Sequence, residues 1–357
     1  MKTDILIIGA GIAGITLARR MAEEKNLKVL LVERRKHIGG YCFDYRDPNG
    51  ILVHRYGPHI FRTDSEQVYN FLSRFTDWYD YQHKVLANVE GKLYPMPINL
   101  DTVNGYLGTN YTSENVAEYF EKVKTFPKEI NNVKDAVESQ IGPVFYKAFF
   151  ENYTKKQWGE APENLPADII ARIPIRANRD DRYFTAKYQA IPAEGYTAMM
   201  QRMLDHKNIR VLLNTDYKEI QNEIECSKIF YSGSIDEFYD YRFGRLPYRC
   251  VSFKFEELGV EEYQPVAVVN YPNNFGYTRI TEFKHFGKGK TEHTVIAKEY
   301  SSDCGEPSYP IPVKDNLKLY RKYEGIKQEN VIFIGRLGRY RYYSMDQIIE
   351  ELLSIAL

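Results

Sequence analysis

Three glycines and one carboxylate near the N-terminus have the residue types and the spacing of a dinucleotide site. The glycines belong to the run Gly9-Ala10-Gly11-Ile12-Ala13-Gly14. Gly9 would allow a tight turn, Gly11 would let the backbone approach a pyrophosphate, and Gly14 would let a helix pack on a strand. Glu33 follows Gly14 by 19 residues, where such a site needs an acceptor for a ribose hydroxyl. The combination favours dinucleotide binding over a purely structural glycine turn.

The elements around this run must place the glycines at the start of a helix. Apolar runs at 4–8 and 29–33 predict two buried strands, and the amphipathic stretch between them predicts a helix whose first N–H groups would face the phosphates. Two later apolar runs also end in glycine, at 229–233 and 332–335. We expect these strands to return to the first sheet, which would make the nucleotide domain discontinuous.

The residues that follow the second strand favour FAD over a nicotinamide cofactor. Gly39 and Gly40 would let the backbone pack against a bulky group where a side chain would clash. Such a pair is typical of FAD proteins of the glutathione-reductase type. Near the C-terminus, Gly335 and Arg336 follow a strand, and a helix is expected to begin near Met345. Its free N–H groups and its dipole would face a flavin edge or a phosphate.

The remaining patterns predict two inserts. Apolar spacing predicts helices from 101 to 176, with Ser113 as the N-cap of one of them, and a hairpin at 84–97 precedes later strand-like runs. The expected fold class is α/β with α+β inserts: a discontinuous Rossmann-like FAD-binding domain, a helical insert domain and an antiparallel β-sheet domain. The FAD-binding domain would comprise 1–80, 190–236 and 312–357. The helical domain would comprise 101–176, and the sheet domain 81–100, 177–189 and 237–311.

The composition excludes several classes of protein. The 357 residues carry a formal net charge of zero, so no global field attracts nucleic acid or an anionic membrane. The four cysteines lack the paired spacing of a zinc site, and neither a metal site nor a disulfide framework is predicted. The first apolar run is too short for a signal peptide, and no run is long enough to span a membrane. We expect a cytoplasmic protein.

Further segments resemble UDP-galactopyranose mutases, bacterial flavoenzymes that interconvert the pyranose and furanose forms of a nucleotide sugar. The matches keep their order over essentially the whole chain, and those around Trp158 and Arg172 are the most specific. The matching segments are 56–61, 153–159, 172–176, 183–184, 191–196, 240–244, 277–279, 298–300 and 335–342. The resemblance implies UDP-galactose as substrate, a homodimer, and an external reductant such as NADPH or NADH.

The resemblance also implies roles for individual residues. Arg172, on a mobile loop, and Arg279 would grip the substrate diphosphate, since a guanidinium matches phosphate oxygens bidentately; with His59 they form the implied catalytic set. The implied substrate residues are Arg62, Phe149 and Tyr153 (the last two stacking on uracil), Thr154, Trp158, Asn270, Glu299, and the phosphate-binding Tyr183, Tyr309 and Tyr342. The implied cofactor residues are 9–14, Glu33, Arg34, Gly39, Gly40, Tyr41, His59, Ile60, Gly335, Arg336, Tyr342, Ser344 and Met345.

The mechanism that the resemblance implies uses no side chain as nucleophile. N5 of reduced FAD attacks the anomeric carbon and displaces UDP, which gives a flavin–sugar adduct. The sugar opens through an iminium, closes on another hydroxyl and is released by UDP. FAD must therefore be reduced before turnover, although no electrons are consumed. The alternatives are a flavin amine oxidase or desaturase, and a flavoprotein that binds nucleotide sugars without catalysis.

Three positions depart from the commonest family pattern. Tyr41 replaces asparagine, and Ser344 replaces an aspartate before Met345. Arg62 replaces a second histidine, which resembles a branch of the family that also accepts UDP-N-acetylgalactosamine. A long fork of N–H donors would reach the acetamido carbonyl of that sugar; the alternative is a pair with Asp64 or another surface carboxylate. The departure leads to the hypothesis of a dual-specificity mutase.

Overall fold

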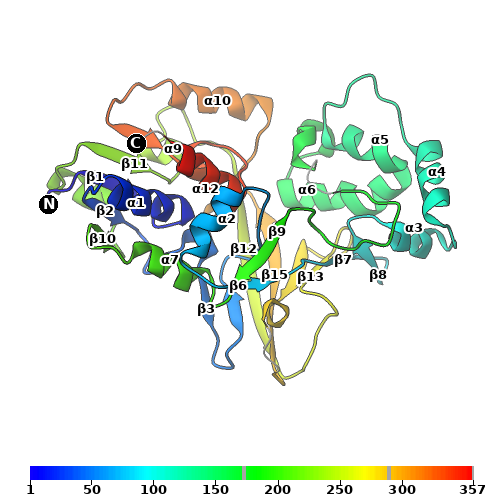
Figure 1. Cartoon of the computed structure of the whole chain (residues 1–357). Coiled ribbons are helices and arrows are strands. Elements are labelled where there is room, and N and C mark those ends of the chain that lie inside the picture. Colours follow the sequence, from blue (N-terminus) through cyan, green and yellow to red (C-terminus); the bar gives the residue numbers. More distant parts are fainter. Residues whose placement is uncertain (171–173, 288–290, 356–357) are drawn as a thin grey trace.

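A parallel sheet near both chain termini is assembled from three separate stretches of sequence (Figure 1). The computed structural model describes residues 1–170, 174–287 and 291–355. The strand order is β10–β2–β1–β11–β17 and every neighbouring pair is parallel. The two later glycine-terminated runs, β11 and β17, therefore join the first sheet, as predicted. The strands are β1 Ile5–Ile8, β2 Val29–Val32, β10 Ile209–Leu212, β11 Lys228–Tyr231 and β17 Val331–Phe333.

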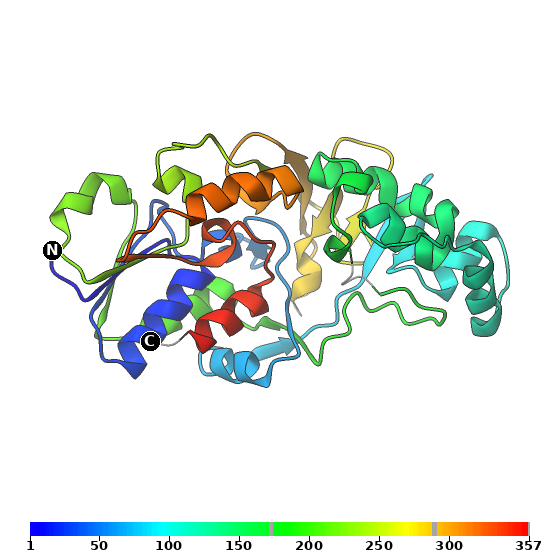
Figure 2. The ribbon, with the colours of Figure 1, turned by 90° about the horizontal axis from the view of Figure 1, so that it is seen from above.

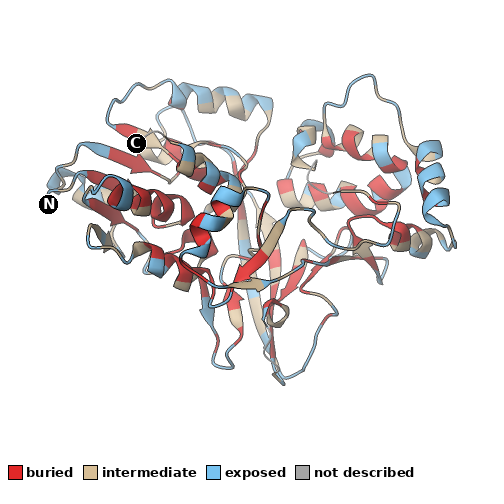
Figure 3. Cartoon of the chain, in the orientation of Figure 1, coloured by how far each residue is buried: buried red, intermediate tan, exposed pale blue. Residues whose placement is uncertain are grey.

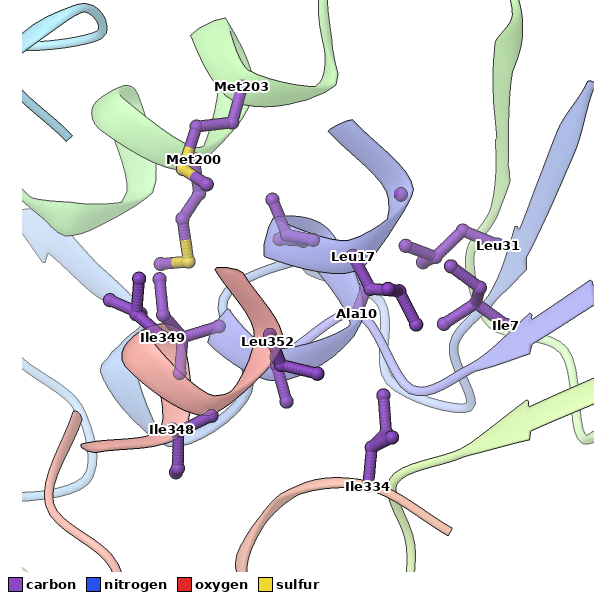
Figure 4. Packing of buried hydrophobic residues seen from close by; sticks show 14 of the residues in the cluster. Ile7, Ala10, Leu17, Leu31, Met200, Met203, Ile334, Ile348, Ile349 and Leu352 are labelled. Atoms are coloured by element: carbon purple, nitrogen blue, oxygen red, sulfur yellow. The ribbon is translucent and has the colours of Figure 1, made fainter. Parts of the chain in front are cut away.

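Helices cover both faces of this sheet, so its central strands are apolar throughout. Alternate side chains point to opposite faces: Ile7 and Leu31 pack under α1, α7 and α12, whereas Leu6 and Leu30 pack toward α8 and α9. Figure 4 shows the first of these cores, where side chains of α7 and α12 surround Leu17 of α1. The helices are α1 Ile12–Glu24, α2 Glu66–Ser73, α7 Tyr196–Leu204, α8 Tyr217–Ile220, α9 Ile235–Phe238, α10 Lys314–Glu324, α11 Gly335–Gly338 and α12 Met345–Ser354.

A mixed sheet stands beside the parallel one, in the order β16–β12–β15–β14–β13–β7–β8. It is antiparallel except for β7 and β13, which run parallel. The sequence predicted an antiparallel sheet; the exception arises because β7 and β13 lie far apart in the chain, so no hairpin fixes their relative direction. The strands are β7 Val85–Val89, β8 Lys92–Met96, β12 Tyr248–Leu258, β13 Val268–Asn270, β14 Arg279–Glu282, β15 Thr294–Ser302 and β16 Pro307–Pro310.

Two small sheets connect these layers. In one of them β9 lies between β5 and β6, and in the other β3 and β4 form a hairpin. The small sheet with β9 joins residues that precede the helical insert to residues that follow it, so it fixes the insert at both ends. The strands are β3 Asp44–Arg46, β4 Leu52–His54, β5 Phe61–Thr63, β6 Trp78–Asp80 and β9 Tyr188–Pro192.

A helical unit occupies the end of the molecule away from both termini (Figure 2). Thr112 rather than Ser113 caps α4, because the Thr112 hydroxyl accepts the Asn115 N–H at 3.3 Å while the helix already includes Ser113. A π-helical segment, Tyr146–Glu151, leads into α6. The unit shares one buried core with the mixed sheet, whereas α4 exposes its outer face (Figure 3). Its helices are α3 Leu100–Leu107, α4 Ser113–Val123, α5 Val133–Phe145 and α6 Asn152–Trp158.

The α/β class predicted from the sequence is confirmed, while the boundaries of the three expected domains stay a prediction. Among the helices of the described residues, none is long and apolar enough to cross a membrane. Within the same ranges, no group of three or more His, Cys, Asp or Glu side chains is arranged to hold a metal ion.

Candidate functional site

The glycines of the first turn form a backbone cradle with a second glycine pair. Gly9 has a φ of +101°, and Gly11 forms a β-bridge with Gly39. The Gly39 N–H donates to the Ala10 carbonyl at 2.7 Å. A Cβ on Gly40 would lie only 2.9 Å from the Cα of Gly11. Two backbone segments thus touch at the N-terminus of α1, where the helix offers free N–H groups to an anion.

Glu33 is buried against this cradle at the end of β2. One carboxylate oxygen accepts the Ala10 N–H at 2.8 Å, and the other accepts the Arg35 N–H at 2.8 Å. Carboxylate oxygens can accept more than one hydrogen bond, so the predicted ribose contact remains open to Glu33. The predicted neighbour Arg34 instead pairs with Glu237 of α9, at 3.2 Å.

The C-terminal segment closes the other side of the cradle. Gly335 has a φ of +71°, and a Cβ there would lie 3.2 Å from the Cβ of Ala13. Arg336 donates to the Tyr343 carbonyl at 2.8 Å, while its buried Nε has no hydrogen-bond partner among the described residues. The cradle is lined by glycine backbone, and it ends at the buried Nε of Arg336. This arrangement fits a dinucleotide with a polar ring system, as FAD has.

The two departures from the family pattern near the cofactor have visible partners. Tyr41 lies under the guanidinium of Arg35, at 5.3 Å, and its hydroxyl donates to the Pro307 carbonyl. Ser344 precedes α12, which begins at Met345 as predicted, and donates from both its N–H (3.0 Å) and its hydroxyl (2.9 Å) to Gln347. Serine thus organises the helix start without a negative charge.

His59 is neutral at physiological pH. Burial is the main reason that its pKa falls to about 4. Its Nδ1 lies 2.9 Å from the Gly57 carbonyl and must donate to it, so Nε2 is left as an acceptor. Its backbone N–H donates to Nδ1 of His54 at 3.0 Å, and the adjacent Ile60 packs on the core that the helical unit shares with the mixed sheet. His59 can therefore orient a neighbour but does not supply a positive charge.

Arg279 and Glu299 form an ion pair across β14 and β15, with Nε and Oε1 3.1 Å apart. The Thr278 hydroxyl donates to the same carboxylate at 3.0 Å. Burial is the largest influence and lowers the pKa of Arg279, but Glu299 together with the nearby Tyr153, Tyr309 and Tyr183 outweighs burial and keeps that pKa above its ordinary value. The guanidinium is therefore a permanent, oriented cation.

Aromatic rings from three distant segments meet beside Arg336. The ring of Trp158 lies 5.3 Å from that of Tyr342 and 6.4 Å from that of Tyr309, and the two tyrosine rings are 5.7 Å apart. The Arg336 guanidinium lies 4.9 Å above the ring of Tyr309. Sequence reasoning placed these residues in the cofactor and substrate sites, and the fold brings them together.

A second group of predicted residues gathers where α6 meets β13. The Tyr153 hydroxyl lies 3.5 Å from Oδ1 of Asn270, and Thr154 is buried on the same helix. Phe149 is only 2% exposed, and its ring packs between Tyr94 and Tyr106, at 5.7 and 5.3 Å. In this arrangement a base would stack on Tyr153 more readily than on Phe149.

Arg62 and Tyr183 both lie against the ring of Phe184. The Arg62 guanidinium is 4.6 Å above the Phe184 ring, and the Tyr183 ring is 5.0 Å from it. Arg172 lies outside the described residues, so its role stays a prediction. The ring of His83 lies 5.6 Å from that of Tyr183, and His83 was not predicted as a site residue, because a lone histidine before a strand carries no motif.

A separate cavity of about 390 Å³ lies between β6 and the turn that joins β3 to β4. None of the predicted site residues lines it. Its walls combine aromatic rings, among them Trp78 and Phe283, with polar and charged side chains such as Arg46 and Lys284. The cavity is therefore not part of the candidate site.

Comparisons with known proteins agree with this geometry. A family model described as UDP-galactopyranose mutase matches residues 148–342, and one described as an NAD(P)-binding Rossmann-like domain matches residues 7–75. A probable UDP-galactopyranose mutase of Klebsiella pneumoniae is 41% identical over 363 residues, which cover 99% of this chain and 94% of that protein. A dTDP-fucopyranose mutase of Escherichia coli is 40% identical over 370 residues, covering 99% and 97%.

The fold is also shared with a solved structure. The crystal structure of a reduced UDP-galactopyranose mutase aligns with a TM-score of 0.79 over 99% of this chain and 93% of that one, at 16% identity. At this identity the likeness shows the fold alone, and the sequence matches carry the family relationship.

Proposed function

This chain belongs to the UDP-galactopyranose mutase family and is an isomerase with FAD as its cofactor, and from this premise we propose that it interconverts UDP-galactopyranose and UDP-galactofuranose. One observation carries the proposal. The glycine cradle ends at Gly335 and Arg336, and the Arg336 guanidinium stacks directly on the aromatic cluster of Trp158, Tyr309 and Tyr342. A redox cofactor and a charged, aromatic-lined substrate site would therefore share one boundary.

The chain's own side chains would bind and orient the sugar nucleotide. Arg279, held by Glu299, offers a fixed cation to the diphosphate, and Tyr153 offers its ring to the base. Positioning and charge stabilisation of this kind can supply much of a rate enhancement. The proposed diphosphate ligands are Arg172, Tyr183, Arg279, Tyr309 and Tyr342.

FAD, when bound and reduced, supplies the nucleophilic chemistry at the sugar. Among the residues proposed to hold it, neutral His59 has Nε2 available to accept a hydrogen bond, and the buried Nε of Arg336 has an N–H to donate. An external reductant such as NADPH or NADH would prepare the enzyme, and the isomerisation itself leaves the electron count unchanged.

We extend the proposal to UDP-N-acetylgalactosamine on the basis of Arg62. Its guanidinium is held over the Phe184 ring, next to Tyr183, which belongs to the proposed phosphate site. Five N–H donors on a long stem suit an acetamido carbonyl better than a short imidazole does. Because one relative at 40% identity is a dTDP-fucopyranose mutase, the substrate panel must also include that sugar nucleotide.

The test incubates dithionite-reduced enzyme separately with UDP-galactose, UDP-N-acetylgalactosamine and dTDP-fucose, and separates pyranose from furanose products by chromatography. We expect furanose product from both UDP-sugars, and none when FAD is held oxidised. Equal turnover by oxidised enzyme would refute the dependence on reduced FAD. Product from the thymidine nucleotide alone would refute the assigned substrates.

A further inference from the structure

The ammonium of Lys156 is surrounded by backbone carbonyls, although Lys156 has no place among the proposed substrate or cofactor residues. From α6, its ammonium donates to the carbonyl of Tyr271 and, at 3.1 Å, to that of Tyr277. The carbonyls of Asn274 and Phe275 lie 3.3 and 3.4 Å away. All four belong to the loop that joins β13 to β14. This loop is thus folded around the charged end of a half-buried lysine from the helical unit.

The loop begins and ends at two proposed substrate residues. Asn270 is the last residue of β13, Arg279 is the first of β14, and the two are cross-strand partners. The Tyr271 N–H donates to the Thr278 carbonyl at 2.8 Å and closes the base of the loop. The loop therefore connects the backbone of Asn270 to that of Arg279, whose guanidinium is oriented by Glu299.

The helix that carries Lys156, α6, also carries the residue proposed to stack on the nucleotide base. Tyr153 lies on α6 three residues before Lys156, and its hydroxyl reaches Asn270. A second tie connects the same loop to the helical unit, because Asn273 donates to the Ala148 carbonyl at 2.9 Å. Lys156 adds a charged anchor in the middle of the proposed binding helix.

We propose that Lys156 is a positioning residue that fixes the separation between the base-binding side of α6 and the phosphate-binding Arg279. The inference rests on the proposed function, in which one sugar nucleotide contacts both. A ligand that contacts both sides binds more tightly when their separation is fixed, because its second contact forms within an existing complex. The affinity of a ligand that carries only the base does not depend on that separation.

The chain offers a matched control in the preceding residue. Lys155 lies on the same helix, but its ammonium pairs with Glu151 of the preceding turn at 2.7 Å on the exposed side. An ion pair of this kind contributes little to stability. Substituting Lys155 removes the same charge from the same helix without touching the loop.

The experiment compares full-length, FAD-loaded and reduced Lys156→Met and Lys155→Met enzymes. Losing the charged anchor should raise the KM for UDP-galactose about tenfold in Lys156→Met and leave kcat within about twofold. Calorimetry should show UDP affinity about tenfold weaker, with uridine affinity within about twofold of wild type. Lys155→Met should match wild type, and Lys156→Arg, which keeps a charged donor, should recover part of the loss.

Wild-type KM and UDP affinity in Lys156→Met would overturn the inference, as would equal losses for UDP and uridine. If Lys156→Met does not fold, Lys156→Gln and Asn273→Ala make the same comparison at the loop's two anchors. A wild-type enzyme that binds UDP but forms no furanose would refute the proposed function instead. The comparison of UDP with uridine would then still decide the role of Lys156.

Discussion

Arg279 and Glu299 face each other on adjacent antiparallel strands, and the carboxylate holds the guanidinium at 3.1 Å. A cation fixed in this way loses little freedom when a ligand arrives, and its planar fork selects pairs of phosphate oxygens. The pair therefore gives the proposed substrate site both its charge and its geometry.

Arg279→Lys should lower kcat/KM for UDP-galactose by about 30- to 100-fold, because a lysine keeps the charge but loses the bidentate fork, worth about 2–3 kcal/mol. Steady-state kinetics of the reduced enzyme measures this. Arg210→Lys, at an exposed position of β10, is the control and should match wild type. Wild-type kcat/KM in Arg279→Lys would contradict the assignment.

Arg62→His should change substrate preference rather than overall activity. Without the long fork over Phe184, turnover of UDP-N-acetylgalactosamine relative to UDP-galactose should fall about tenfold, the value of one charge-assisted hydrogen bond. Parallel kcat/KM measurements on both sugars provide the ratio. If the ratio of the two kcat/KM values is unchanged, Arg62 does not bind the acetamido group.

Gly40→Ala should weaken FAD binding at least tenfold, because the new Cβ would press on the backbone of Gly11 at 2.9 Å. Fluorescence titration of apoenzyme with FAD measures the affinity. Gly91→Ala is the matched control: Gly91 also has a positive φ, yet a Cβ there meets nothing within 4 Å. If both variants lose FAD equally, backbone strain rather than contact in the cradle is responsible.

Glu282→Gln should destabilise the mixed sheet by about 2–3 kcal/mol, since the buried carboxylate accepts hydrogen bonds from several groups. Its partners are the backbone N–H groups of Tyr263 and Gln264, the Thr294 hydroxyl and Nε2 of His285. Urea unfolding measures the loss. Glu256→Gln, which breaks a more exposed pair with Lys298, should cost less than about 1 kcal/mol.

The loss in Glu282→Gln should depend on pH. Burial alone would raise the pKa of Glu282, but its hydrogen bonds from His285, Thr294 and the backbone lower it below 4.5, so its stabilisation disappears as the pH falls below that value. Burial is the largest influence on His285 and lowers its pKa, but Glu282 together with the Gln264 carbonyl outweighs burial and raises that pKa above 6.5. The contribution of His285 therefore disappears as the pH rises through the raised value. The difference between wild type and variant should therefore be largest between pH 4.5 and 6.5, and a flat difference from pH 4 to 8 would contradict the pairing.

The sequence predicted the parallel sheet well because that part of the fold depends on local rules. Gly9 has a positive φ, and a Cβ on Gly14 or Gly40 would press on neighbouring backbone, so glycine is required at these three positions. Apolar runs that end in glycine mark strands of a buried parallel sheet. The contacts of individual residues with FAD stay a prediction. The Ser113 cap was wrong by one residue because adjacent hydroxyl residues, Thr112 and Ser113, compete for the same position.

Other features depend on pairings that no local pattern encodes. The parallel pairing of β7 with β13, the burial of Phe149 behind Tyr94, and the reach of Lys156 into a loop more than a hundred residues later all arise from tertiary packing. The family resemblance includes the segment that contains Lys156, but it does not indicate which groups Lys156 contacts. Conversely, Arg172 was singled out by resemblance and lies outside the described residues.

The return of the last strand to the first sheet has a consequence for synthesis of the protein. The cradle that begins at Gly9 is closed by Gly335, and Arg20 donates to the carbonyls of Leu352 and Ile355. Residues up to Gly335 must therefore be synthesised before the two sides of the cradle can meet. Flavin can be loaded only after that point, and chains that stall before Gly335 should be colourless.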